Sequence, residues 1–193
     1  GYSALEDQNS AANSYNTAVG SQVGRNITSG KNHTLMGYRA GQTMTTTAET
    51  VLIGSEAGYA INSTDANGTV AIGYAAGKAI TTSQGNTAIG YEALEVENDG
   101  HYNTAIGYQA LSSQTGTSAE VGNTAVGYQA ADALTTGTRS VFIGAHAGGA
   151  TTTGGYNVAI GYGAMRYPTG LTGNVAIGWN ALTAMSGSAG ISA

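Results

Sequence analysis

Small and aliphatic residues alternate with polar ones along this chain in an order that repeats about every 17 residues. Residues 104–107 (TAIG) show the centre of one repeat: Thr or Val, then usually Ala, then an aliphatic residue and Gly. The stretch NTAIGYEAL at 86–94 returns as NTAIGYQAL at 103–111 and as NTAVGYQAA at 123–131. A fixed period of this length predicts a repeat architecture in which each unit packs on its neighbours.

Alignment on the repeat Gly shows how regular the array is. Most of these glycines follow the previous one at the basic period, and three intervals are slightly longer. The array fills residues 1–193, and a truncated copy starts at Gly1, so we expect a single domain of about eleven coils, part of a longer fibre chain or a filament subunit. The repeat glycines are Gly20, Gly37, Gly54, Gly73, Gly90, Gly107, Gly127, Gly144, Gly161 and Gly178.

The residues before each repeat Gly predict a short β-strand, because β-branched side chains are concentrated there. Since side chains alternate along a strand, the Thr/Val column and the aliphatic column share one face, and the Ala column lies on the other. Both faces are small or apolar, so we expect both to be buried, with the Ile column forming a narrow core. A second, fainter strand is predicted by aliphatic residues seven positions after the Gly: Ile27, Met44, Ile61, Ile80, Leu134 and Met185.

Two polar columns separate these segments. Asn recurs four residues before the Gly, as at Asn86, Asn103 and Asn123, and Asn, Thr or Ser recurs eight residues after it. One repeat unit is then long enough for two short strands and two turns. We therefore predict an all-β parallel β-solenoid (β-roll) whose coils lie about 4.8 Å apart, with stacked Asn and Thr side chains hydrogen-bonded along its axis. A helical solenoid is disfavoured, because Gly, Thr and Asn are poor helix formers.

Two Ala columns bear on assembly. One is the middle position of the strand, and the other lies three residues after the Gly, as at Ala93 and Ala110. Flat surfaces of this kind suit close contact with another chain, so we expect a homotrimer of rolls about one axis. The alternative is a single roll in which both Ala columns are covered by turns.

Composition narrows the classes of function. Only 9% of residues are charged, against about 25% in typical domains, and Cys is absent. The net charge of −5 and six scattered basic residues do not predict nucleic-acid binding. There is no apolar run of the ~18 residues that a membrane span needs, so we expect no membrane insertion. The His and Asp side chains are dispersed, and no metal-ligand or catalytic spacing stands out among them: His33, His101, His146, Asp7, Asp65, Asp99 and Asp132. We therefore expect a protein that is not an enzyme and has no cofactor or metal.

A column of aromatic residues directly after the repeat Gly is the best candidate for binding. Such a ladder could contact sugar rings of a cell surface; alternatively, it covers the core edge or a subunit seam. The Thr column could in principle order water and bind ice, although Asn9, Asn62 and Asn98 interrupt it and an axial ladder explains it better. The candidate glycan contacts are Tyr38, Tyr74, Tyr91, Tyr108, Tyr128, Tyr162 and Trp179.

These motifs carry a resemblance. NTAIGYQAL and its variants NVAIGYGAM and TVAIGYAAG resemble repeats of bacteriophage tail-fibre and related surface-fibre proteins. They are also similar to the NSVAIG-type repeats in YadA-type heads of trimeric autotransporter adhesins, which are left-handed parallel β-rolls assembled as trimers. The 17-residue coil and the GYxA continuation depart from the adhesin heads and favour the fibre type. The resemblance implies an extracellular, virion-surface or cell-surface element used for attachment, with a cell-surface glycan or protein receptor as partner.

Three hypotheses follow. The first is a non-enzymatic structural fibre segment, a tail-fibre or adhesin shaft or head. The second is an extracellular filament subunit that stacks end to end, since uncapped solenoid ends present open strand edges. The third is a glycan-binding or ice-binding solenoid.

Overall fold

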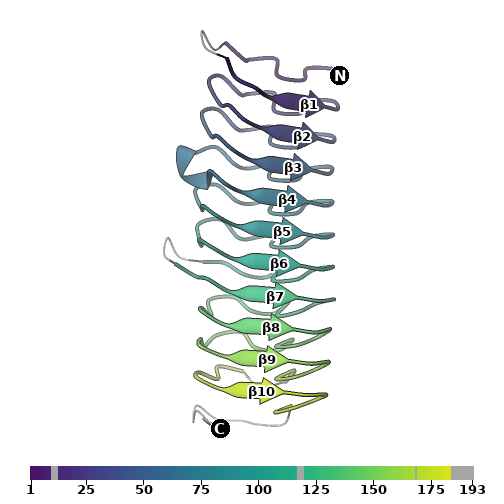
Figure 1. Ribbon diagram of the computed structural model, residues 1–193, viewed down its shortest axis with the longest axis vertical. Helices are drawn as coiled ribbons and strands as arrows, with labels where there is room; N and C mark the ends of the chain where they lie inside the picture. The colour runs from purple at the N-terminus through teal and green to yellow at the C-terminus, as the bar shows by residue number, and fades with distance from the viewer. Residues whose placement is uncertain (10–12, 117–119, 168, 184–193) are drawn as a thin grey trace.

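The computed structural model describes residues 1–9, 13–116, 120–167 and 169–183, and these residues form a parallel β-solenoid (Figure 1). Each coil contributes one three-residue strand, and the ten strands stack in sequence order in one parallel sheet. The predicted fold class is therefore confirmed. The elements are β1 (Thr17–Val19), β2 (Thr34–Met36), β3 (Val51–Ile53), the 3-10 helix η1 (Thr64–Ala66), β4 (Val70–Ile72), β5 (Thr87–Ile89), β6 (Thr104–Ile106), β7 (Thr124–Val126), β8 (Val141–Ile143), β9 (Val158–Ile160) and β10 (Val175–Ile177).

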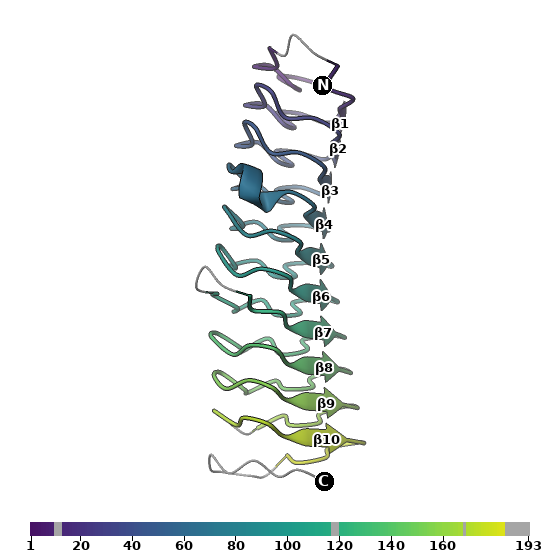
Figure 2. The ribbon, with the colours of Figure 1, turned by 60° about the vertical axis from the view of Figure 1, so that its left-hand side comes forward.

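The strands pair in the register that the repeat predicts. Thr87 lies beside Thr104, and Ile89 lies beside Ile106. The longer repeats keep this register, because the strand-to-strand pairing continues from Thr104 to Thr124 across the longest repeat. Figure 2 shows the resulting stack of nearly identical coils, with η1 in one of the connecting segments.

The number of coils differs from the prediction of about eleven. Ten strands form nine consecutive pairs, which makes about nine turns. The copy that begins at Gly1 contributes no strand, because the strand positions precede the repeat Gly. Its residues still stack on the next coil through backbone hydrogen bonds, such as Leu5 N to Val23 O at 3.1 Å.

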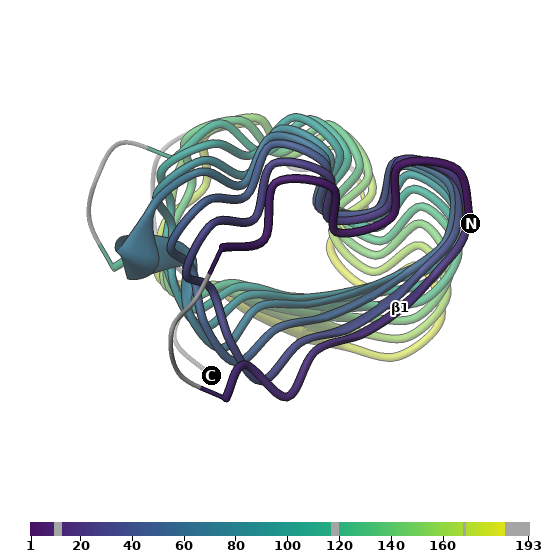
Figure 3. The same ribbon diagram turned by 90° about the horizontal axis from the view of Figure 1, so that it is seen from above.

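The strand buries only its middle residue, so the expectation that the Ile column forms the core is wrong. Ala88 and Ala105 are fully buried, whereas Ile89 and Ile106 are half-buried and lie on the outer face of the sheet. The opposite wall of the coil supplies the bulky core side chains, such as the fully buried Ile80. Because those side chains fill the narrow interior, a small residue fits best beneath the strand. Figure 3, which looks down the stack, shows the loop that each coil makes around this interior.

The segment after the repeat Gly is a series of turns rather than the predicted second strand. Glu92 and Leu94 both have positive φ (53°), and the N–H of Ala93 bonds to Gly90 O at 3.4 Å within the coil. The N–H groups of Glu92 and Leu94 instead donate to neighbouring coils, to Tyr74 O at 2.9 Å and Ala110 O at 3.0 Å. The aliphatic residues of that segment are nevertheless fully buried at Ile27, Met44, Ile61, Ile80 and Leu134, while Met185 lies outside the described residues.

Both Ala columns lie inside the coil, so they are not surfaces for another chain. Ala93 and Ala110, in the column after the Gly, are fully buried, as are Ala88 and Ala105 of the strand column. The alternative of a single roll with both Ala columns covered by turns is the one the structure adopts within one chain.

The repeat Gly lies where the backbones of neighbouring coils come closest. Gly107 has a φ of 135°, which L-residues rarely adopt, and a Cβ added to it would overlap the carbonyl oxygen of Gly127. The close approach at this column is therefore between coils of the same chain.

The Asn column forms the predicted ladder. Asn86 Oδ1 accepts the N–H of Asn103 at 2.7 Å, and Asn103 Oδ1 accepts the N–H of Asn123 at 3.0 Å. The amide of Asn86 also donates to Gly100 O at 2.9 Å. All three Asn side chains are buried, so these bonds satisfy polar groups that would otherwise destabilise the interior.

Candidate functional sites

The outer face of the sheet is a continuous uncharged surface. Its two outward columns contain only Thr and Val on one side and Ile, Val and Met on the other. Met36 is 47% exposed, and Ile177 is 66% exposed. In the middle of the sheet the Ile side chains of neighbouring strands pack against one another, because the strands are only about 4.8 Å apart. The ends of these side chains still point to solvent. Sequence analysis missed this face, because it placed the Ile column in the core.

The aromatic column lies beside this face and is exposed, as a binding ladder requires. The exposed fractions are 46% for Tyr38, 46% for Tyr74, 42% for Tyr91, 43% for Tyr108, 50% for Tyr128, 47% for Tyr162 and 77% for Trp179. The candidate glycan contacts are therefore accessible to solvent, and their role in glycan binding stays a prediction.

The rings of this column stack on one another along the axis. The centroids of Tyr74 and Tyr91 lie 5.1 Å apart, those of Tyr91 and Tyr108 5.0 Å, and those of Tyr108 and Tyr128 5.4 Å. The column is interrupted where a small residue takes the aromatic position, at Ser21, Ser55 and Ala145. Within the stack the ring faces cover each other, so a ligand would meet ring edges and hydroxyl groups there. Such a stack also stabilises the edge of the roll.

The Thr column donates its hydroxyl groups to the main chain. Thr81 Oγ1 donates to Asn98 O at 3.3 Å, and Thr135 Oγ1 donates to Thr152 O at 2.8 Å, each in the next coil. These bonds are the axial ladder predicted from the sequence. They occupy the hydroxyl protons that an ice-binding array would present to water.

Two buried titratable groups interrupt the polar and apolar columns. His33 takes an Asn position, where its Nδ1 lies 2.8 Å from Thr50 Oγ1, and burial lowers its pKa to about 4. Glu97 takes an aliphatic position, and burial raises the pKa of its carboxyl, although the N–H groups of Gly100 and Gly116 bond to it and oppose that rise. Both groups are enclosed by the roll, so they bear on stability rather than on binding.

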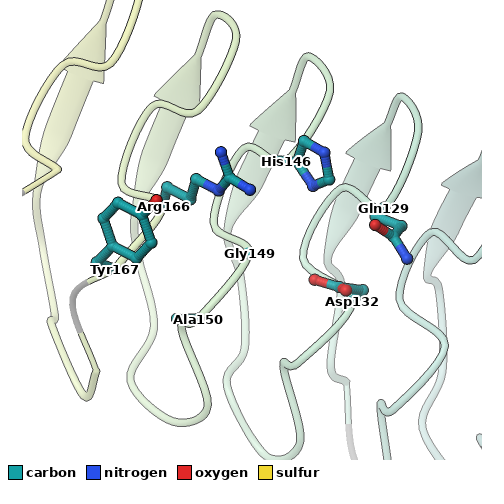
Figure 4. Close-up of a pocket in the computed structure, with 7 residues that line it drawn as sticks. All are labelled: Gln129, Asp132, His146, Gly149, Ala150, Arg166 and Tyr167. Carbon is teal, nitrogen blue, oxygen red and sulfur yellow. The ribbon is translucent and has the colours of Figure 1, made fainter.

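A pocket of about 220 Å³ opens on the side of the roll, and Figure 4 shows the side chains around it. Asp132, His146 and Arg166 come from three successive coils, although sequence analysis treated Asp132 and His146 as dispersed. The sequence spacing could have predicted that these charged side chains lie close together. Asp132, Gly149 and Arg166 stand one repeat period apart, so they share one column.

Electrostatics in the pocket are mixed. Burial raises the pKa of the Asp132 carboxyl, while the positive charge of Arg166 and the proximity of His146 act in the opposite direction. The guanidinium of Arg166 lies over the ring of Tyr167, 5.4 Å from its centroid. Within the described part of the chain that guanidinium forms no ion pair or hydrogen bond.

Among the described residues, no group of three or more His, Cys, Asp or Glu side chains could hold a metal ion. The same residues include no helix that is long and apolar enough to span a bilayer. No protein-family model, curated protein or solved structure matches the chain.

Proposed function

We propose that this chain is a structural, non-enzymatic segment of a homo-oligomeric fibre, a shaft or head used in attachment to a host cell or another surface. The observation that carries the proposal is the outer face of the sheet, with its uncharged columns on ten strands. The repeats' resemblance to tail-fibre and adhesin-head sequences supports the same role and an extracellular or virion-surface location.

The size of this face supports burial against other copies. Nine strand spacings of about 4.8 Å give a length of about 43 Å, and side chains across a short strand form a stripe roughly 10 Å wide. The stripe thus covers on the order of 400 Å², comparable to the largest apolar patch on a typical monomer, which is often functional. Burying it would contribute at most about 10 kcal/mol per protomer before the entropic cost of association, at about 25 cal/mol per Å² of apolar area, because the Thr hydroxyl groups of the stripe are polar.

A three-fold arrangement with parallel axes suits this geometry. The stripe is narrow and repeats at each strand, so three copies can turn their stripes toward one shared axis. Thr and Val from one copy then pack beside Ile from the next, and no charged side chain is buried in the contact. The exposed aromatic column and the polar turns are left on the outside for contact with a receptor.

Charge insertion on the outer face tests the proposal. The double variant Ile89→Glu, Ile106→Glu adds two carboxylates to the middle of the stripe, where they lie in neighbouring strands. If the stripe is an interface, this variant is a monomer of 19.2 kDa by light scattering, whereas the unmodified chain is a trimer. A folded variant that keeps the mass of the unmodified assembly would disprove the proposed interface.

A matched control adds the same charge elsewhere. Gln84 and Thr136 are exposed and lie in the turn segments, outside the strands. The control Gln84→Glu, Thr136→Glu should keep the oligomeric mass, and circular dichroism should show that both double variants remain folded. Continuous filaments in electron micrographs of the unmodified chain would instead support end-to-end stacking.

A further inference from the structure

The pocket exists because one coil lacks a side chain in a column that otherwise carries polar ones. A Cβ added at Gly149 would lie 3.6 Å from Asp132 Oδ1 and 3.7 Å from Arg166 Cγ. The carboxylate of one coil and the side chain of Arg166 two coils away therefore line opposite sides of the same gap. Figure 4 shows Gly149 between them, with His146 on the coil of Gly149.

The groups around the gap differ in chemistry. The Arg166 guanidinium is a cation with five N–H donors, and no described residue bonds to it. Asp132 is an acceptor, and the amide of Gln129 and the ring of His146 add further polar atoms to the lining. The His146 ring is held edge-on between Tyr128 and Tyr162, with centroids 5.2 and 6.0 Å away, so its place is fixed by the aromatic column.

This combination discriminates between ligand classes. A carboxylate pairs with a guanidinium through two parallel hydrogen bonds, which favours a ligand with one carboxylate. A compact dianion such as phosphate is disfavoured, because the Asp132 carboxylate lines the same gap and would repel it. Asp132 instead suits a ligand that offers hydroxyl donors on the side away from its carboxylate. The volume of about 220 Å³ is below that of pockets for drug-sized ligands and suits a single sugar ring.

We propose that this pocket binds one acidic sugar residue, a hexuronate, whose carboxylate lies on Arg166 and whose ring hydroxyls donate to Asp132. Gln129 and His146 contact the remaining hydroxyls, and Tyr167 borders the ring beside the guanidinium. The inference rests on the attachment role proposed above, and it names the chemistry of the surface that the chain would meet. Stacked repeats create the site only where Gly149 interrupts the column.

A matched pair of ligands tests the specificity. Methyl β-glucuronide and methyl β-glucoside differ only in having a carboxylate or a hydroxymethyl group. We expect the glucuronide to bind with a dissociation constant on the order of 1 mM, and the glucoside at least ~10-fold more weakly, by calorimetry and saturation-transfer NMR. Equal binding of the two sugars, or no binding of the glucuronide, would overturn the proposal.

A matched set of variants tests the location. Gly149→Gln fills the gap without removing any of its polar groups, and Gln is accepted at the equivalent position of another coil, Gln42. This variant and Arg166→Gln should each lose at least ~10-fold in affinity for the glucuronide. Glu95→Gln introduces the same side chain into the same column two coils before Asp132, outside the pocket lining, and should bind as the unmodified chain does. Retained binding by Gly149→Gln would place the sugar elsewhere.

The mass of the same samples separates the two proposals. An assembled chain that does not bind the glucuronide would overturn the pocket and leave the fibre assembly in place. A monomeric chain that binds it would overturn the assembly and leave the pocket in place.

Discussion

Replacement of His33 by Asn should remove a specific acid sensitivity of the roll. His33 is 1% exposed and occupies the Asn column, where burial lowers its pKa from 6.5 to about 4. At pH values between these two, the unfolded chain binds a proton that the folded chain does not. The free energy of unfolding therefore falls as the pH drops from 6.5 to 4, by about 1.4 kcal/mol per unit, or about 3 kcal/mol in all.

The substitution His33→Asn restores the side chain that the column otherwise favours. Other Asn residues of this column donate to a carbonyl 14 residues further on, as Asn16 does to Gly30 and Asn123 does to Gly137. The equivalent acceptor for position 33 is the carbonyl of Thr47. The introduced amide can therefore be satisfied, and it does not titrate.

Urea denaturation of both proteins at pH 7 and pH 4.5, followed by circular dichroism, measures the effect. The unmodified chain should lose about 2 kcal/mol more than His33→Asn between these pH values. Carboxyl groups common to both proteins cancel in this comparison. Parallel pH dependence of the two proteins would refute the reasoning, because His33 would then bind its proton equally well in the folded and unfolded states.

Two further predictions test the packing of the coils. Gly107→Ala should destabilise the roll by about 3 kcal/mol in urea denaturation, because its Cβ meets the Gly127 carbonyl at a φ of 135°. Gly122→Ala, with no atom within 4 Å of its added Cβ, should cost about 1 kcal/mol. Equal effects of the two substitutions would contradict the close approach of the coils at Gly107. Phe142→Ala should lower the free energy of unfolding by about 3–5 kcal/mol in the same assay, although Ala is the usual residue of that column. Gly148 leaves room for the Phe142 ring, so loss of the ring creates a cavity. An unchanged stability would show that the coil collapses around the smaller side chain.

The register of the stack could be predicted from sequence because it depends on period alone. Thr104 pairs with Thr124 despite the longer repeat between them, since the extra residues lie outside the strand positions of the repeat. The Asn ladder followed for the same reason: a buried amide at a fixed position, such as Asn103, can bond to its equivalent in the next coil.

Which face of the strand points into the interior could not be predicted, because both faces carry small or apolar residues. Alternation shows that Ile106 and Ala105 point to opposite sides, and the side that is interior depends on the volume that the opposite wall already fills. The turns after the repeat Gly were missed because Glu92 and Leu94 adopt a positive φ that their side chains disfavour, so their residue types do not predict it.

The pocket could have been found from the spacing of its residues. Asp132, Gly149 and Arg166 stand at the same position of three successive repeats, and a column with opposite charges around a Gly is a departure from the repeat. The exposure of the aromatic column was foreseeable from its polar hydroxyls, whereas the stacking of Tyr91 on Tyr108 depends on side-chain angles that the repeat does not reveal.

Sedimentation equilibrium of the unmodified chain, over concentrations from about 1 to 100 µM, tests most directly whether the outer sheet face joins copies of this protein. The account predicts a species with three times the 19.2 kDa mass of one chain that persists on dilution, because the apolar stripe is buried between protomers. A single species of 19.2 kDa at every concentration would show that the face stays open to water, and it would contradict the account.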